Sequence, residues 1–264
     1  MNAISFDPAD IAIAASVLLF DSALSVCMRL RIHGPLLVAS LRMLLQLVAL
    51  GFVLRAVFAA HAAWLTGLLV LGMTLAAARE AAARPKRRLQ HGHFLASLVS
   101  VAAPGLLTCL FAVVCLLPGE AGWTPRFIVP MAGILLGNVL NAVSIGMAGV
   151  LEGIVPETAA IEARLMRGDP FHEATQPLAR DAIRRAMVPL INQMSAAGII
   201  TMPGVMTGQV LAGMDPLQAA TYQIVLMLLL AGGSALGAIL SVRWVLRRLT
   251  DERDRLRLDR LRSR

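Results

Sequence analysis

The chain has 264 residues, of which 58% are apolar and 15% are charged, and its mean hydropathy is +0.73. A soluble domain of this length fills its core with less apolar sequence, so we expect most of the chain to lie in lipid. The net charge of +8 does not predict nucleic-acid binding, because the basic residues adjoin apolar stretches and no stacking platform of aromatic residues accompanies them.

Seven apolar stretches are long enough to cross the ~30 Å hydrocarbon layer of a membrane. They lie at about 10–28, 36–54, 62–83, 94–117, 127–151, 187–211 and 217–242. The sixth is the least hydrophobic and is interrupted by Gly and Pro. The prediction is an all-α integral membrane protein with about seven transmembrane helices, forming one transmembrane domain over residues 1–264.

The basic residues predict the orientation of these spans. All but three of the 24 Lys and Arg residues lie in four clusters, at 29–31, 79–88, 164–185 and 243–264. By the positive-inside rule the clusters are cytoplasmic, so the N-terminus is outside and residues 243–264 form a basic cytoplasmic tail. Residues 1–10 carry Asp7 and Asp10 but no basic residue, unlike a cleaved signal peptide. We therefore expect a multi-pass protein of a bacterial inner (cytoplasmic) membrane.

Two charged residues, Asp21 and Arg42, lie well inside predicted spans. Each is about 10 Å from the cytoplasmic end of its helix, so antiparallel neighbours would bring them level. We hypothesise an intramembrane ion pair, with Gln46 one turn from Arg42 on the same face. The alternative is that Arg42 extends to the cytoplasmic interface while Asp21 is paired elsewhere or protonated.

The residues needed for several kinds of catalysis are missing from the sequence. Cys27, Cys109 and Cys115 fall within predicted spans and form no CxxC pair, and the five histidines fall in loops or at span ends. This pattern argues against an intramembrane hydrolase and leaves any metal site unknown. The one lysine, Lys86, follows Pro85, so no phosphate-binding loop for ATP exists. We expect a chain that is not an enzyme and carries no cofactor of its own.

The connection at 152–186 is the longest between predicted spans. Gly168 predicts a helix stop, Asp169 an N-cap and Pro170 the first position of a new helix. Pro177 predicts a kink or a fresh helix start. The resulting corner would either dock a cytoplasmic protein or lie on anionic lipid through its arginines.

The sixth span contains Pro203, Gly204 and Gly208, which would break the helix. Broken helices in a membrane are tolerated where protein or a water-filled cavity receives the freed backbone groups, and they often mark transport sites. The alternative is close packing through small residues, as in the pairs Gly133/Gly137 and Gly233/Gly237. Met187, Met194, Met202, Met206 and Met214 follow the same span; their sulfur atoms suit soft ions such as Cu(I), or the side chains fill gaps in packing.

Several segments resemble known transporter sequences. The segment from Glu162 to Gly168 resembles the E-A-A-x-x-x-G coupling motif of bacterial ABC importer permeases, with Arg164 in place of the second Ala. Val188-Pro189 lies farther from the Gly than in those importers. The spacing instead resembles the FetB-type permease family, which is associated with iron export and, in plants, with aluminium tolerance.

The densest match to that family is Met202-Pro203-Gly204-Val205-Met206-Thr207-Gly208, with Met202 where the family usually has Leu and Val205 where it usually has Met. The other matching segments are Arg42 with Gln46-Leu47, Pro130 to Asn138, Arg180-Asp181 with Ile183-Arg184, Leu211 to Pro216, and Tyr222-Gln223. Together they run from about Arg42 to Val242.

The resemblance implies the membrane-spanning subunit of an ABC transporter that exports metal ions such as iron. Its expected partners are an ATP-binding subunit that holds ATP-Mg, a second permease chain and the lipid bilayer. The coupling residues it implies are Glu162, Ala163, Gly168, Asp169, Pro170, Phe171, Arg180, Asp181 and Arg184. The resemblance and the polar groups at membrane depth together imply a translocation path. Its residues are Arg42, Gln46, Asn138, Asn141, Asn192, Thr201, Met202, Pro203, Gly204, Met206 and Gln223.

Two other functions stay open at this point. An ion-coupled carrier would use Asp21 as its protonatable group and need no ATPase. A membrane scaffold would bind a cytoplasmic protein through the basic loops without moving any solute.

Overall fold

The structure is a computed structural model that describes residues 7–30, 32–60, 62–116 and 123–263. The chain divides into two compact units, Met1–His61 and Ala62–Arg264.

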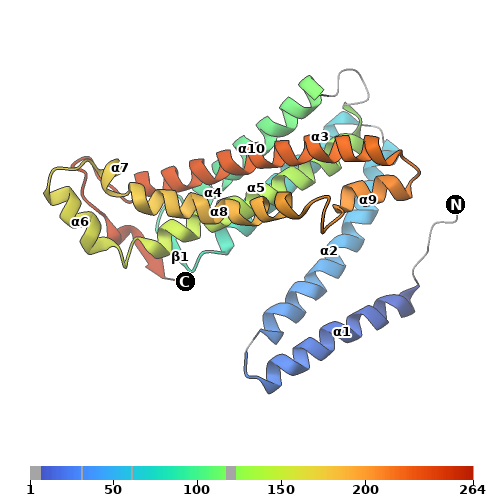
Figure 1. The fold of residues 1–264 in the computed structure, drawn as a ribbon, viewed down its shortest axis with the longest axis horizontal. Helices are drawn as coiled ribbons and strands as arrows, with labels where there is room; N and C mark the ends of the chain where they lie inside the picture. The colour runs from blue at the N-terminus through green and yellow to red at the C-terminus, as the bar shows by residue number, and fades with distance from the viewer. Residues whose placement is uncertain (1–6, 31, 61, 117–122, 264) are drawn as a thin grey trace. The chain divides into compact units, whose positions relative to one another are not determined.

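The N-terminal unit is a hairpin of two helices, α1 (Pro8–Cys27) and α2 (His33–Ala60), which diverge from the turn that joins them (Figure 1). The buried Ser25 holds the turn between them, because its hydroxyl oxygen accepts hydrogen bonds from the backbone N–H groups of Ile32 and His33, both at 3.2 Å. Large apolar side chains such as Phe20 and Phe52 are about 70% exposed, as suits helices surrounded by lipid.

The larger unit is a bundle of helices with one small sheet (Figure 1). Its elements in chain order are α3 (Ala63–Ala83), β1 (Arg87–Leu89), α4 (His93–Phe111) with the π-helical turn η1 (Ala112–Leu116), α5 (Pro125–Gly153), α6 (Thr158–Met166), α7 (Phe171–Ala174), α8 (Gln176–Ala196), α9 (Gly204–Leu211), α10 (Pro216–Arg248), the 3-10 turn η3 (Leu258–Arg260) and β2 (Leu261–Ser263).

Helix α5 is the centre of this unit and packs against α3, α4, α8 and α10. Small residues let the helices approach closely. A Cβ atom added at Gly237 of α10 would lie 2.8 Å from a methyl group of Val139 of α5 and 3.3 Å from the backbone oxygen of Ser100 of α4. The predicted packing role of Gly233 and Gly237 is thus confirmed, whereas Gly137 has no neighbour within 4 Å of such an atom.

The predicted all-α membrane protein is confirmed. Among the described residues, six helices are long and apolar enough to cross a membrane: Ala9–Cys27, His33–Ala59, Ala63–Ala83, His93–Leu116, Pro125–Gly153 and Pro216–Arg248. The remaining expected span, 187–211, is divided between the end of α8 and the short helix α9. The predicted interruption therefore exists, but it begins at Ala197, ahead of Pro203.

The C-terminal residues fold back onto the connection between α3 and α4. Strand β2 pairs antiparallel with β1, placing Leu261 opposite Leu89. Nearby, the Arg260 guanidinium donates to the backbone oxygens of Arg248, at 2.9 Å, and Thr250, at 3.0 Å. The first of these bonds satisfies a carbonyl group that the end of α10 leaves without a helical partner. Residues 249–263 are thus an ordered part of the larger unit.

Candidate functional site

The predicted coupling segment forms a sharp corner between α6 and α7. Gly168 adopts a φ of +95°, the left-handed conformation that glycine accepts without strain. The N–H groups of Gly168 and Asp169 donate to the carbonyl oxygens of Leu165 and Arg164, at 3.0 and 3.2 Å. This is the Schellman arrangement, which closes the end of α6. The predicted helix stop at Gly168 is confirmed.

The predicted cap of the following helix was wrong. The residue preceding α7 is Pro170, and Asp169 makes no capping bond to the new helix. Instead, the Asp169 carboxylate accepts a hydrogen bond from Nε of Arg164 at 3.0 Å, with Arg167 at 3.8 Å. The Arg164 guanidinium is a stronger partner for the Asp169 carboxylate than a neutral backbone N–H group of α7, because charge-assisted hydrogen bonds are stronger. Asp169 therefore stabilises the corner through its ion pair with Arg164.

The corner presents part of the predicted coupling set to solvent. Phe171 is buried beneath it, and the Thr175 hydroxyl donates to the Phe171 carbonyl oxygen at 2.8 Å. Pro177 lies in the first turn of α8, where it starts the helix instead of kinking it. The exposed members of the set are Glu162, Ala163, Gly168, Arg180, Asp181 and Arg184.

Helix α8 lies closely along α5. Its buried residues, Leu178, Ala182, Ala186 and Leu190, recur every four positions and form one stripe. Two glycines of α5 receive this stripe: an added Cβ atom would lie 3.0 Å from the Ala182 Cβ atom at Gly149, and 2.7 Å from a Leu178 methyl group at Gly153. We call this contact the α5–α8 seam. It ties the coupling corner to the centre of the bundle.

A groove of about 540 Å³ adjoins the corner, between α7, the start of α8 and the end of α10. Phe171 and Ile183 give it an apolar floor, while Arg180, Arg243 and Arg247 give it a basic character. Two predicted coupling residues, Phe171 and Arg180, therefore share one concave surface with the end of α10.

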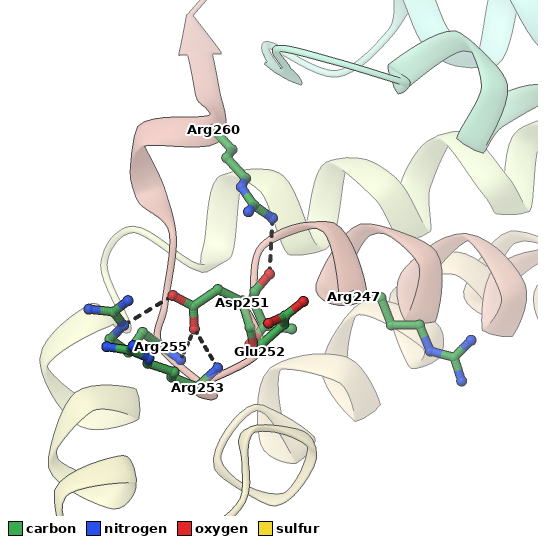
Figure 2. A pocket seen from close by; sticks show the side chains of 7 residues that line it. Arg247, Asp251, Glu252, Arg253, Arg255 and Arg260 are labelled. Atoms are coloured by element: carbon green, nitrogen blue, oxygen red, sulfur yellow. Dashed lines mark hydrogen bonds and ion pairs between the residues drawn. The ribbon is translucent and has the colours of Figure 1, made fainter.

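The ordered tail forms a second charged region beside the end of α10 (Figure 2). The Asp251 carboxylate accepts hydrogen bonds from the backbone N–H groups of Arg253 and Arg255, at 3.0 and 2.9 Å, and from Nε of Arg255 at 3.0 Å. The Arg255 N–H bond is the main reason that the pKa of Asp251 is lowered. Figure 2 shows Arg247 pointing away from this cluster, so the guanidinium groups here do not converge on one point.

A separate pocket of about 390 Å³ lies at the break between α8 and α9. It brings together three residues of the predicted path, Pro203, Met206 and Gln223. Gln223 of α10 is 7% exposed, and its Oε1 atom is buried without a hydrogen-bond partner among the described residues. Met194 and Met227 also line the pocket, so methionines from three helices surround it. We call it the methionine pocket.

The other predicted path residues lie elsewhere. Asn138 donates to the Ile134 carbonyl oxygen of its own helix at 3.0 Å, and Asn141 accepts from Arg84 at 2.7 Å. The Asn138 amide thus bonds within its own helix, whereas Asn141 links α5 to the residue that follows α3. Asn192, Thr201, Met202 and Gly204 are exposed and do not line the pocket.

The residues predicted near the N-terminus belong to the other compact unit. Asp21 of α1 and Arg42 and Gln46 of α2 have exposed side chains. Their ion pair and their place on a path stay predictions.

Sequence reasoning missed Met227, which lies on the floor of the methionine pocket and is 6% exposed. It follows Gln223 by four residues, so both side chains lie on one face of α10. That spacing was the available signal, but an apolar span contains many such pairs.

The comparisons with known proteins agree with this membrane architecture. The model of a family described as an uncharacterised protein family, UPF0014, matches residues 8–250. The chain is 31% identical over 253 residues to the UPF0014 membrane protein slr1647 of Synechocystis, an alignment covering 96% of this chain and 97% of that relative. It is 32% identical over 229 residues to the UPF0014 membrane protein STAR2 of rice, covering 86% and 78%.

A third relative carries a functional name. The chain is 27% identical over 263 residues to an Escherichia coli protein named "Probable iron export permease protein FetB", and the alignment covers 100% of both chains. No solved structure matches the chain. Since the family model extends over most of the sequence and relatives align along nearly their full length, the chain belongs to the UPF0014 family of membrane proteins.

Proposed function

We propose that this chain is the membrane-spanning subunit of an ABC transporter that exports metal ions, such as iron, from the cytoplasm. The full-length similarity to the Escherichia coli protein named as an iron export permease supports the class of cargo. The single observation that carries the coupling mechanism is that α8 joins the exposed corner at one end to the methionine pocket at the other.

The length of α8 makes it suitable as a mechanical link. Arg180 stands near its start, and Met194, which lines the pocket, lies about 21 Å further along the helix at 1.5 Å per residue. The α5–α8 seam holds the helix through backbone-to-backbone proximity at Gly149. A displacement of the corner by a docked protein would therefore move α8, which continues through Pro189, and change the walls of the pocket.

The energy for that displacement would come from a partner. An ATP-binding subunit holding ATP-Mg would dock on the corner through Glu162, Ala163 and the exposed start of α8. Because two ATP-binding subunits usually enclose the nucleotides together, we propose a pair of permease chains in the complex. The assembly would lie in a bacterial inner membrane with the basic tail on the cytoplasmic side.

The test is purification of the tagged chain from its native membranes in a mild detergent, with mass spectrometry of the proteins that co-elute. We expect a stoichiometric ATPase with a phosphate-binding loop, and we expect it to be lost from variants Glu162→Lys and Gly168→Asp. Arg253→Gln, an exposed charge change in the tail, serves as the matched control and should retain the ATPase.

Other outcomes would overturn the proposal. A chain that elutes alone and still moves solute in vesicles without ATP would be an ion-coupled carrier. A chain that retains a partner lacking ATPase motifs and moves no solute would be a scaffold.

A further inference from the structure

We propose that the methionine pocket binds a soft monovalent cation of the Cu(I) and Ag(I) class, through the thioether sulfur atoms of Met194, Met206 and Met227. This binding site goes beyond the proposed function; only the statement that a soft ion is among the exported metal ions rests on that function.

The three thioethers come from three separate helices that meet at the break. Met194 is on α8, Met206 on α9 and Met227 on α10, and all three line one cavity of about 390 Å³. A sphere of that volume is about 9 Å across, and a methionine side chain has three rotatable bonds, so the sulfur atoms can converge on a shared ion. Packing at a helix break does not require methionine on all three sides.

The chemistry of the lining selects the kind of ion. The residues around the pocket carry no carboxylate, imidazole or thiol group. Hard divalent cations require several oxygen ligands, and here one polar side chain, Gln223, is present. Uncharged thioethers are good ligands for Cu(I), and a monovalent ion brings less charge into an apolar cavity than a divalent one.

Gln223 brings an unpartnered amide oxygen close to the pocket. A buried amide oxygen without a hydrogen bond loses its solvation with nothing in return, so such atoms are uncommon in folded proteins. The Oε1 atom of Gln223 is in this state, on a side chain that is 7% exposed and lines the pocket. A cation held by the thioethers beside this side chain would give its oxygen an electrostatic partner once the amide turns toward the pocket.

The pocket is exposed on one side in the isolated chain. Met194 is 38% exposed, whereas Met227 and Gln223 are 6% and 7% exposed and form the floor. Along α10, Gln223 lies about 36 Å from Arg247 at the basic end of the helix, so the pocket is at the end of the bundle remote from the coupling corner. That position is where an exporter would release its cargo.

The nearest alternative grouping is weaker. Among the residues that the structure describes, no three His, Cys, Asp or Glu side chains come together as a metal site. The candidate ligands are therefore the thioether sulfur atoms of the methionine pocket, which are softer than the oxygen ligands that hard metal ions prefer.

The test is titration of the purified full-length chain with Ag(I) in halide-free detergent solution, followed by calorimetry. Cys27, Cys109 and Cys115 are free thiols that would also bind Ag(I), so every protein in the series carries alanine at these three positions. We expect one tight equivalent. Met194→Leu, Met206→Leu and Met227→Leu should each weaken it at least tenfold, and the triple variant should abolish it.

Leucine is close to methionine in volume, so the variants should fold, and their Tm checks this. Met214→Leu is the matched control, because Met214 is in the same region but does not line the pocket. A second measurement is X-ray absorption of the Cu(I)-loaded protein that carries the three alanine substitutions and keeps all three pocket methionines. Sulfur atoms should form the nearest shell of ligands around the ion.

The inference fails if the triple leucine variant binds Ag(I) as tightly as its parent, or if the Cu(I) spectrum shows nitrogen and oxygen ligands alone. Because binding is measured on the isolated chain, the result is separate from the ATPase co-purification. Tight thioether binding without a co-purifying ATPase would refute the proposed function and leave the site intact, and the reverse combination would refute the site alone.

Discussion

The α5–α8 seam makes a quantitative prediction for the substitution Gly149→Ala. The new Cβ atom would lie 3.0 Å from the Ala182 Cβ atom and 3.2 Å from its Cα atom. Ordinary carbon contacts are about 3.5–4.0 Å, so α8 must move away by roughly 0.5–1 Å at this point. Overpacking of this kind costs about 1–3 kcal/mol, and the better helix propensity of alanine offsets up to ~1 kcal/mol of that.

Gly137→Ala is the control on the same helix. A Cβ atom there has no neighbour within 4 Å, so this variant receives the propensity gain without the clash. The two variants should differ by about 1–3 kcal/mol in free energy of unfolding, which corresponds to about 2–4 °C in Tm for each kcal/mol. The assay is thermal unfolding in one detergent at one protein concentration.

A double variant tests whether the cost arises at the seam. Adding Ala182→Gly removes the Cβ atom that Gly149→Ala would strike, so the two changes together should cost less than the sum of the two separately. Equal Tm values for Gly149→Ala and Gly137→Ala would refute the close approach of α8 to α5. Strict additivity in the double variant would place the strain at another contact.

Three further predictions concern turns and caps. Gly168→Ala forces a left-handed φ of +95° on a residue with a Cβ atom and should lower stability by about 1 kcal/mol, measured as a fall in Tm, whereas Gly208→Ala within α9 should not. Asp215→Ala removes the carboxylate that accepts two backbone bonds at 3.1 Å at the start of α10 and should cost about 0.5–2 kcal/mol, while Asp215→Asn should restore most of it, again by Tm. The lowered pKa of Asp251 means that its bonds stabilise the tail above the unfolded value near 3.8 and are lost as pH falls through the lower folded pKa. The protection factors for hydrogen exchange at the Arg253 and Arg255 amides should therefore be higher at pH 7 than in acid, and Asp251→Asn should lower them at pH 7 and remove this transition. Unchanged protection factors in that variant would contradict the role of the carboxylate.

The parts of the fold that could be predicted depend on local sequence. Long apolar runs predict spanning helices because lipid requires every backbone group to be bonded within the helix. Gly168 predicted a helix end because its conformation is set by its own lack of a Cβ atom. Gly233 and Gly237 predicted close packing for the same reason.

The parts that could not be predicted depend on residues distant in the chain or on competition between neighbours. Asp169 failed as a cap because Arg164 offers its carboxylate a stronger partner. The break in the sixth expected span begins before Pro203 because Gly198 turns the chain at a φ of +82°, and its N–H group donates to the Thr201 carbonyl oxygen at 2.9 Å.

The candidate site could be predicted only in part, because its residues come from three separate helices. Pro203, Met206 and Gln223 were chosen as individual residues, and the structure places all three around one pocket. Met227 completes that pocket only because α10 returns beside α8 and α9, a tertiary fact that has no signature in a uniformly apolar span.

The pairing of β1 with β2 has a consequence for the order of events during synthesis. Leu89 and its partner Leu261 are separated by most of the larger unit, and Gln90 also bonds to Asp259, 169 residues away. At about 5–20 residues per second, a ribosome needs roughly 10–35 s to travel from one strand to the other. During that interval β1 has an open edge while α4, α5, α8 and α10 are still entering the bundle. Closure of this small sheet is therefore among the last steps of maturation, because β2 is synthesised only after α10 is complete.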